Sequence, residues 1–175
     1  MKIYRFESIV KFEKDTHLTP EYLEWVNDLE LQGIISSLKK QWTMQMLEEF
    51  VSNQDDDPDI DFFAIIAYKS KSGEGGIHVG NAKLRRSGAR IATLSILIGR
   101  KEARSCGIGR EVVMLMVAFC NEKYQHIEAI EAVVHKTNHK SQRLFKSLSF
   151  KLTTTIANEH IYTYSYGQKR SSSIR

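Results

Sequence analysis

Residues Ala92–Val117, ATLSILIGRKEARSCGIGREVVMLMV, decide the fold because they combine the signals of a strand, a glycine turn and a helix. Residues 93–98 are apolar and β-branched and end at Gly99, which predicts a buried strand. Further on, the apolar positions change to helical spacing: Ile108, Val112, Leu115, Met116 and Phe119. The polar segment between the strand and the helix is therefore predicted to lead directly to the N-terminus of the helix.

This turn has the composition of an anion-binding site. Backbone N–H groups in the first turn of a helix have no intrahelical partner, and the helix dipole favours negative charge there. Gly107 and Gly109 let a bulky anion approach the backbone, and Arg104 and Arg110 add positive charge. The segment lacks the Gly-Lys-Ser/Thr of a Walker loop and the third small residue of a dinucleotide fingerprint. An ordinary strand-to-helix turn is the alternative interpretation.

Length and composition predict a single domain over residues 1–167, followed by a polar tail over 168–175. Hydrophobic residues make up 42% and charged residues 26% of the 175 positions, as in ordinary globular proteins. The net charge of +4 suits an anionic cofactor, but it is too small and too scattered to indicate nucleic acid. No apolar run has the length of a membrane span or the form of a signal peptide.

The two cysteines, Cys106 and Cys120, match neither a metal-binding spacing nor a disulfide framework. Cys120 falls on the predicted helix as a small core residue. Cys106 lies in the glycine turn, where a nucleophilic role would require a partnered base. We therefore expect no metal, and a reducing cytoplasm as the location.

The remaining pattern predicts an α+β fold, in which helices flank one largely antiparallel sheet. A helix begins at Pro20 with Thr19 as its N-cap, and another begins after Thr43. The aspartate run at 55–61 is interpreted as a solvated connection. The other expected elements are strands at 3–12, 61–68, 77–84, 127–135, 150–156 and 160–166, and helices at 30–38 and 138–148.

The pattern Arg104-x-x-Gly107-x-Gly109 resembles the acetyl-coenzyme A pyrophosphate loop of the GCN5-related N-acetyltransferases (GNAT family). Three further segments fit this family in the same order. HLTPEYLEWVNDLE (17–30) and VGNAKL (79–84) resemble its RimJ/RimL-like branch, and 136–150 resembles the family's late Asn-x-x-Ser/Ala-x-x-Leu-Tyr/Phe helix. The resemblance covers nearly the whole chain and implies a GNAT-like fold.

The resemblance also implies roles in binding acetyl-coenzyme A (acetyl-CoA). The backbone of Ile96, Leu97 and Ile98 would pair with the pantetheine arm as another strand does. Asn138 would contact the cofactor, although asparagine is also a common helix N-cap. The backbone N–H groups that would hold the pyrophosphate belong to Arg104, Ser105, Cys106, Gly107, Ile108, Gly109 and Arg110.

Two positions depart from the family pattern. Phe145 stands where many relatives have a tyrosine that protonates the leaving thiolate, and Thr93 stands where many have a glutamate base. Ser141, one helical turn before Phe145, is the first substitute for the donor, and a plain surface serine is its alternative interpretation. Tyr162 and Tyr164 are further candidate donors. The candidate bases are His78, His135 and His139, although the pattern favours a surface or core histidine at each of these positions.

Trp25 and Asp28, in the early helices, are the candidate residues for acceptor binding. The resemblance implies transfer of an acetyl group to a primary amine, with a nucleotide-linked amino sugar as the preferred acceptor and a protein N-terminus as the next. It also allows a homodimer. Because the usual donor and base are absent, a non-catalytic acyl-CoA-binding module stays open as an alternative.

Overall fold

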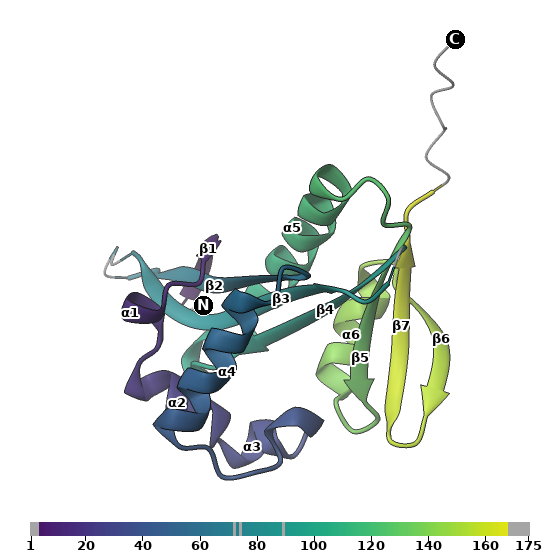
Figure 1. Cartoon of the computed structure of the whole chain (residues 1–175). Coiled ribbons are helices and arrows are strands. Elements are labelled where there is room, and N and C mark those ends of the chain that lie inside the picture. Colours follow the sequence, from purple (N-terminus) through teal and green to yellow (C-terminus); the bar gives the residue numbers. More distant parts are fainter. Residues whose placement is uncertain (1–3, 72, 74, 89, 168–175) are drawn as a thin grey trace.

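The predicted strand and helix around the glycine turn both form, as β4 (Ile91–Ile98) and α5 (Ile108–Lys123). The computed structural model describes residues 4–71, 73, 75–88 and 90–167, so the predicted tail at 168–175 lies outside the described residues. Figure 1 shows the arrangement of the elements along the chain.

The other elements alternate much as the sequence predicts. The strands are β1 (Tyr4–Lys11), β2 (Ile60–Lys69), β3 (Ile77–Arg86), β5 (Ala129–His135), β6 (Lys151–Ile156) and β7 (Glu159–Ser165). The helices are α1 (Lys14–His17), α2 (Pro20–Val26), α3 (Leu29–Gln32), α4 (Met44–Asp56) and α6 (His139–Ser147), with 3₁₀ turns η1 (Ser36–Leu38) and η2 (Lys101–Ala103).

The seven strands form one sheet in the order β1-β2-β3-β4-β5-β7-β6. Every neighbouring pair is antiparallel except β4 and β5, which are parallel. These two strands pair over only three positions, from Ile91↔Ala129 to Thr93↔Glu131. Beyond Thr93 they diverge, so the sheet opens at the C-terminal end of β4 (Figure 1). The fold is therefore the mixed, mostly antiparallel GNAT-like architecture expected from the sequence.

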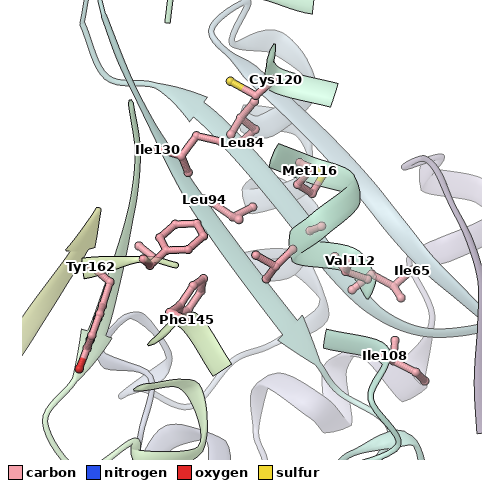
Figure 2. Packing of buried hydrophobic residues seen from close by; sticks show 14 of the residues in the cluster. Ile65, Leu84, Leu94, Ile108, Val112, Met116, Cys120, Ile130, Phe145 and Tyr162 are labelled. Atoms are coloured by element: carbon pink, nitrogen blue, oxygen red, sulfur yellow. The ribbon is translucent and has the colours of Figure 1, made fainter. Parts of the chain in front are cut away.

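Helices cover both faces of the sheet. On one face, α5 packs its apolar side chains against β3 and β4, and Phe145 of α6 joins the same cluster (Figure 2). On the other face, α2, α3 and α4 form a second cluster around Trp25 and Leu47. Cys120 is buried as predicted, but Leu115 is 40% exposed and does not belong to the core face of α5. The core positions on α5 are Ile108, Val112, Val113, Met116 and Cys120.

Side-chain caps set several helix starts. Thr19 accepts a hydrogen bond from the backbone N–H of Tyr22, and Thr43 accepts one from Met46, which confirms both predicted N-caps. The single helix predicted over 30–38 is wrong, because the chain forms α3 and then η1 instead. The first part of the aspartate run is also helical, because α4 continues to Asp56.

Gly99, just after β4, allows the indole ring of Trp25 to lie directly against the backbone. A Cβ atom at this position would lie 2.0 Å from Cδ2 of Trp25, whose side chain is 5% exposed and held by the second cluster. We therefore expect Gly99→Ala to destabilise the protein by about 3 kcal/mol or more, because such overpacking must displace the indole ring. Urea unfolding measures this, and Gly99→Ala combined with Trp25→Leu should recover much of the loss. An unchanged midpoint for Gly99→Ala would contradict the packing.

Candidate active site

The opening between β4 and β5 exposes backbone hydrogen-bonding groups on one edge of β4. The N–H of Gly99 donates to the carbonyl of Val79 on β3, at 2.9 Å. Because backbone groups alternate along a strand, those of Leu97 also point toward β3, and those of Ile96 and Ile98 point into the opening. The predicted pairing of Leu97 with a ligand therefore does not agree with this direction, whereas the backbone of Ile96 and the N–H of Ile98 remain candidates.

The glycine turn places uncapped N–H groups beside this opening. Ser105 and Gly107 have positive φ angles of 60° and 92°. Gly107 is the N-cap of α5, and no side chain caps the helix there. The first N–H groups of α5 are thus left for a ligand, as at other anion-binding helix N-termini.

Gly109 keeps the space between these N–H groups and the opening free. A Cβ atom at this position would lie 3.5 Å from Cδ2 of Leu144 on α6 and 3.6 Å from Cδ1 of Ile96 on β4. An alanine would be accommodated, but any larger side chain would fill the gap between β4, α5 and α6. The shape and the donors therefore fit a ligand whose phosphate lies at α5 and whose chain runs along β4.

The Arg104 side chain has a structural role that the sequence pattern does not indicate. Its Nε donates to the carbonyl of Ile98 at 3.1 Å, and one Nη donates to the carbonyl of Gly99 at 2.6 Å. Two carboxylates pair with its guanidinium, Asp28 at 2.8 Å and Glu30 at 3.1 Å. The positive charge expected beside the turn is thus neutralised at Arg104. The exposed Arg110 keeps its charge there and donates to Ser147 Oγ at 3.2 Å.

The two predicted acceptor residues are also part of the framework. Trp25 packs against Gly99, and the half-buried Asp28 pairs with Arg104 and caps α3 by accepting a hydrogen bond from the N–H of Glu30. Burial raises the pKa of Asp28, but the bonds from Arg104 and Glu30 outweigh it, so the pKa lies below its ordinary value. Trp25 and Asp28 thus have framework contacts, and both also line the groove described below, so their predicted role in acceptor binding stays a prediction.

The first turn of α6 carries the predicted donor. Asn138 caps the helix, because its Oδ1 accepts a hydrogen bond from the N–H of Ser141 at 3.1 Å. Ser141 is half-buried. Phe145, one turn later, is 3% exposed and packs against Phe150 and Tyr162. The family's tyrosine position is thus a core position here.

The structure separates the two candidate tyrosines of β7. Tyr164 pairs with Ile130, at the level where β4 and β5 are still joined, and its ring packs against Phe150 and Tyr166. The prediction of Tyr164 as a catalytic residue does not agree with this position. Tyr162 is fully buried, and its hydroxyl finds no hydrogen-bond partner among the described residues. In Figure 2 this hydroxyl points away from the side chains of α5.

A groove of about 550 Å³ runs beside the end of β4. It is lined by α2, the start of α3 and the segment 99–102, and Trp25 and Gly99 are among the lining residues. Arg100 forms an ion pair with Glu21 across it, at 2.6 Å. Four carboxylates line the groove, those of Glu21, Glu24, Asp28 and Glu102. Arg100 offsets Glu21 and Arg104 offsets Asp28, so the groove keeps a small excess of carboxylates, with Glu24 and Glu102 against Lys101.

His78 lies next to the buried His17, with their ring centroids 5.1 Å apart, and also packs against Trp25 of the groove. The Nε2 of His78 lies 2.9 Å from the carbonyl of Gly80 and 3.0 Å from Oδ1 of Asn81. Burial lowers the pKa of His78 to about 4, and burial also lowers the pKa of His17. Both rings are neutral at pH 7, which favours the core interpretation of His78.

The low pKa of His78 predicts a loss of stability in mild acid. In the unfolded chain His78 binds a proton below its ordinary pKa of 6.5, whereas in the folded protein it does so only near pH 4. The free energy of unfolding should therefore fall by about 3 kcal/mol between pH 6.5 and 4 through this group. Urea unfolding across this range should show a shallower slope for His78→Gln. His126→Gln, at an exposed position, serves as control, and identical slopes for all three proteins would contradict the prediction.

Residues 9–151 match the family model described as acetyltransferase (GNAT) domain. The chain therefore belongs to the GNAT family and is an acetyltransferase. No curated protein matches its sequence.

Solved structures share the fold at low sequence identity. A domain from Methanocaldococcus jannaschii has 20% identity and a TM-score of 0.76, with coverage of 91% of this chain and 97% of that chain. Spermidine N-acetyltransferase from Vibrio cholerae, in complex with CoA and spermine, has 14% identity and a TM-score of 0.69, with coverage of 89% and 92%. PaiA N-acetyltransferase from Thermoplasma acidophilum, in complex with coenzyme A, has 17% identity and a TM-score of 0.68, with coverage of 91% and 98%.

The described part of the chain contains neither a metal-binding cluster nor a membrane-spanning helix. Within residues 4–71, 73, 75–88 and 90–167, no cluster of three or more histidine, cysteine or carboxylate side chains could hold a metal ion. Over the same ranges, no helix combines the length and the apolar character needed to cross a membrane.

Proposed function

We propose that this acetyltransferase is a cytoplasmic enzyme that uses acetyl-CoA to acetylate the primary amine of a small molecule by direct attack. The opening between β4 and β5, beside the uncapped start of α5, carries the proposal. The N–H groups of 105–110 would hold the pyrophosphate, and the backbone of Ile96 and Ile98 would bind the pantetheine arm. The acyl thioester would then lie at the end of β4, next to the first turn of α6.

The reaction requires a neutral amine, because an ammonium ion has no lone pair. The amine nitrogen bonds to the acetyl carbon, the carbon–sulfur bond breaks, and the nitrogen loses a proton while the leaving thiolate gains one. A backbone N–H on the open edge of β4 stabilises the oxyanion as charge develops. We assign proton donation to Ser141, because Phe145 has no hydroxyl and Ser141 is half-buried at the start of α6.

Within the class of small amines, the RimJ/RimL-like motifs of the sequence favour a nucleotide-linked amino sugar. The same motifs give a protein N-terminus as the next candidate. The groove at the end of β4 favours a further candidate, a polycationic amine, because its carboxylates outnumber its cations. A nucleotide diphosphate would meet repulsion there. The spermidine N-acetyltransferase with the same fold supports this candidate.

Thiol release from acetyl-CoA tests the function, with the acceptor supplied as polyamines, nucleotide-linked amino sugars or short peptides with free N-termini. We expect turnover with one of the two small-molecule pools. Turnover with peptides alone would overturn the small-amine proposal. Calorimetry with CoA supplies the independent readout, and the absence of both CoA binding and turnover would overturn the use of acetyl-CoA.

A further inference from the structure

The strand β6 has a free edge at one end of the sheet. In the described part of the chain β6 pairs only with β7, and it is the outermost strand on its side (Figure 1). All six of its residues are exposed, and the large apolar side chains of Leu152 and Ile156 are 47% and 59% exposed. The backbone N–H and C=O groups along this edge are therefore accessible to another chain.

The composition of β6 favours pairing more than that of β1, the strand at the opposite edge of the sheet. Charged side chains on an edge strand oppose its pairing with another chain. Three of the eight residues of β1 are charged, Arg5, Glu7 and Lys11, and Glu7 accepts a hydrogen bond from the backbone N–H of Gly76. In β6, KLTTTI, only Lys151 is charged and four of the six residues are β-branched, which suits a paired strand.

The turn between β6 and β7 shows which backbone groups of β6 are free. Ile156 pairs with Glu159 across a two-residue turn, in which Ala157 has a φ of 46°. Residues that flank such a turn hydrogen-bond to one another, and the direction of the backbone groups alternates along the strand. The N–H and C=O of Thr155 therefore point away from β7. A bulge between residues 152 and 154 interrupts the pairing with β7, so the regular part of the free edge is centred on Thr155.

Two charged residues lie symmetrically about Thr155 in the sequence. Lys151 comes four residues before it and Glu159 comes four residues after it. Lys151 pairs with Thr163, which is an even number of residues from Glu159, so both charged side chains lie on the same face of the sheet. When a second copy is aligned antiparallel with Thr155 opposite Thr155, Lys151 of each copy comes level with Glu159 of the other. The edge is thus complementary in charge to a second copy of itself.

We propose that β6 forms the interface of a homodimer, in which the β6 strands of two copies pair antiparallel about a two-fold axis at Thr155. The two seven-stranded sheets then join into one. Each Thr155 N–H donates to the carbonyl of the other Thr155, and Ile156 lies opposite Thr154 of the second copy. Lys151 and Glu159 form an ion pair at each end. The interface gives a surface to the homodimer that the sequence allows.

Charge reversal tests the alignment of the two strands. Analytical ultracentrifugation of the unaltered protein should show a dimer that salt weakens. Lys151→Glu and Glu159→Lys should each raise the dimer dissociation constant about tenfold, because each places like charges together at both ends of the interface. The double variant exchanges the two charges and should restore the dimer. Glu48→Lys, at an exposed position of α4, is the control and should leave the dimer unchanged.

A disulfide tests the position of the two-fold axis. Thr155→Cys, combined with Cys106→Ser to remove the half-exposed thiol, should cross-link two copies under mild oxidation. The Cα atoms of a hydrogen-bonded antiparallel pair lie about 5.5 Å apart, which a disulfide can span. Thr154→Cys in the same background is the matched control, because its counterpart lies two residues further along the strand, out of reach.

Three results would overturn the inference. One is a protein that stays monomeric at every concentration tested. Another is a dimer that both charge reversals leave intact while circular dichroism shows the variants folded. The third is equal cross-linking of Thr155→Cys and Thr154→Cys, because the axis would then not lie at Thr155.

Discussion

Gly107→Val is expected to lower the affinity for CoA by about 100-fold or more while the protein remains folded. Gly107 has a φ of 92°, which costs a β-branched residue more than the 1–2 kcal/mol of an ordinary side chain. The turn would relieve this strain by changing its backbone conformation, so the N–H groups at the start of α5 would no longer converge. Loss of two charge-assisted hydrogen bonds, at about 1.5–3 kcal/mol each, corresponds to a factor of about 10²–10⁴ in Kd.

Gly107→Asn is the matched control for this experiment. Asparagine adopts positive φ more readily than other non-glycine residues, so this variant should keep most of the affinity. Calorimetry with CoA measures both variants, and circular dichroism checks that they fold. Full affinity in a folded Gly107→Val would contradict a role for the turn in phosphate binding.

Ser141→Ala is expected to reduce kcat by about 10²-fold or more, because loss of a positioned proton donor typically costs 10²–10⁴ in rate. The KM for acetyl-CoA should change little, since the backbone groups of the glycine turn and β4 are intact. The helix should also keep its start, because Asn138 caps it through the N–H of Ser141 and not through the hydroxyl.

The pH profile distinguishes a donor from a structural serine. Ser141→Ala should lose rate most with acceptors whose reaction is limited by departure of the thiolate, and Ser141→Cys should restore part of the rate with a shifted profile. Ser165→Ala, at an exposed position of β7, is the control. Unchanged kcat in Ser141→Ala would remove Ser141 from the mechanism and direct attention to the buried hydroxyl of Tyr162.

The order of helices and strands could be predicted from the sequence because it depends on local features that are also present in the folded structure. Thr19 and Thr43 mark helix starts by side-chain capping, and the change from strand to helical periodicity around Gly107 marks the central turn. The helix predicted at 30–38 failed because the chain breaks between α3 and η1, within a run whose apolar spacing alone suits one helix. Leu115 has the spacing of a core residue, but α5 turns it toward solvent.

The site was harder to predict, because its charged residues act through partners distant in sequence. Arg104 is separated by 76 residues from Asp28, and only the fold shows that the two neutralise one another. The Trp25-x-Asn27-Asp28 segment suggested acceptor binding. In the structure Trp25 packs on Gly99, Asn27 bonds the backbone of Trp42, and Asp28 pairs with Arg104. No local pattern distinguishes such framework contacts from ligand contacts.

The brief pairing of β4 with β5 has a thermodynamic consequence. Three residue pairs form the seam between a four-stranded and a three-stranded part of the sheet. A ligand that hydrogen-bonds to the free edge of β4 and also contacts α6 would bridge this seam, and its binding energy would count toward the stability of both parts. Binding of the cosubstrate would then stabilise the middle of the sheet, and release of the product CoA would remove this stabilisation in each catalytic cycle.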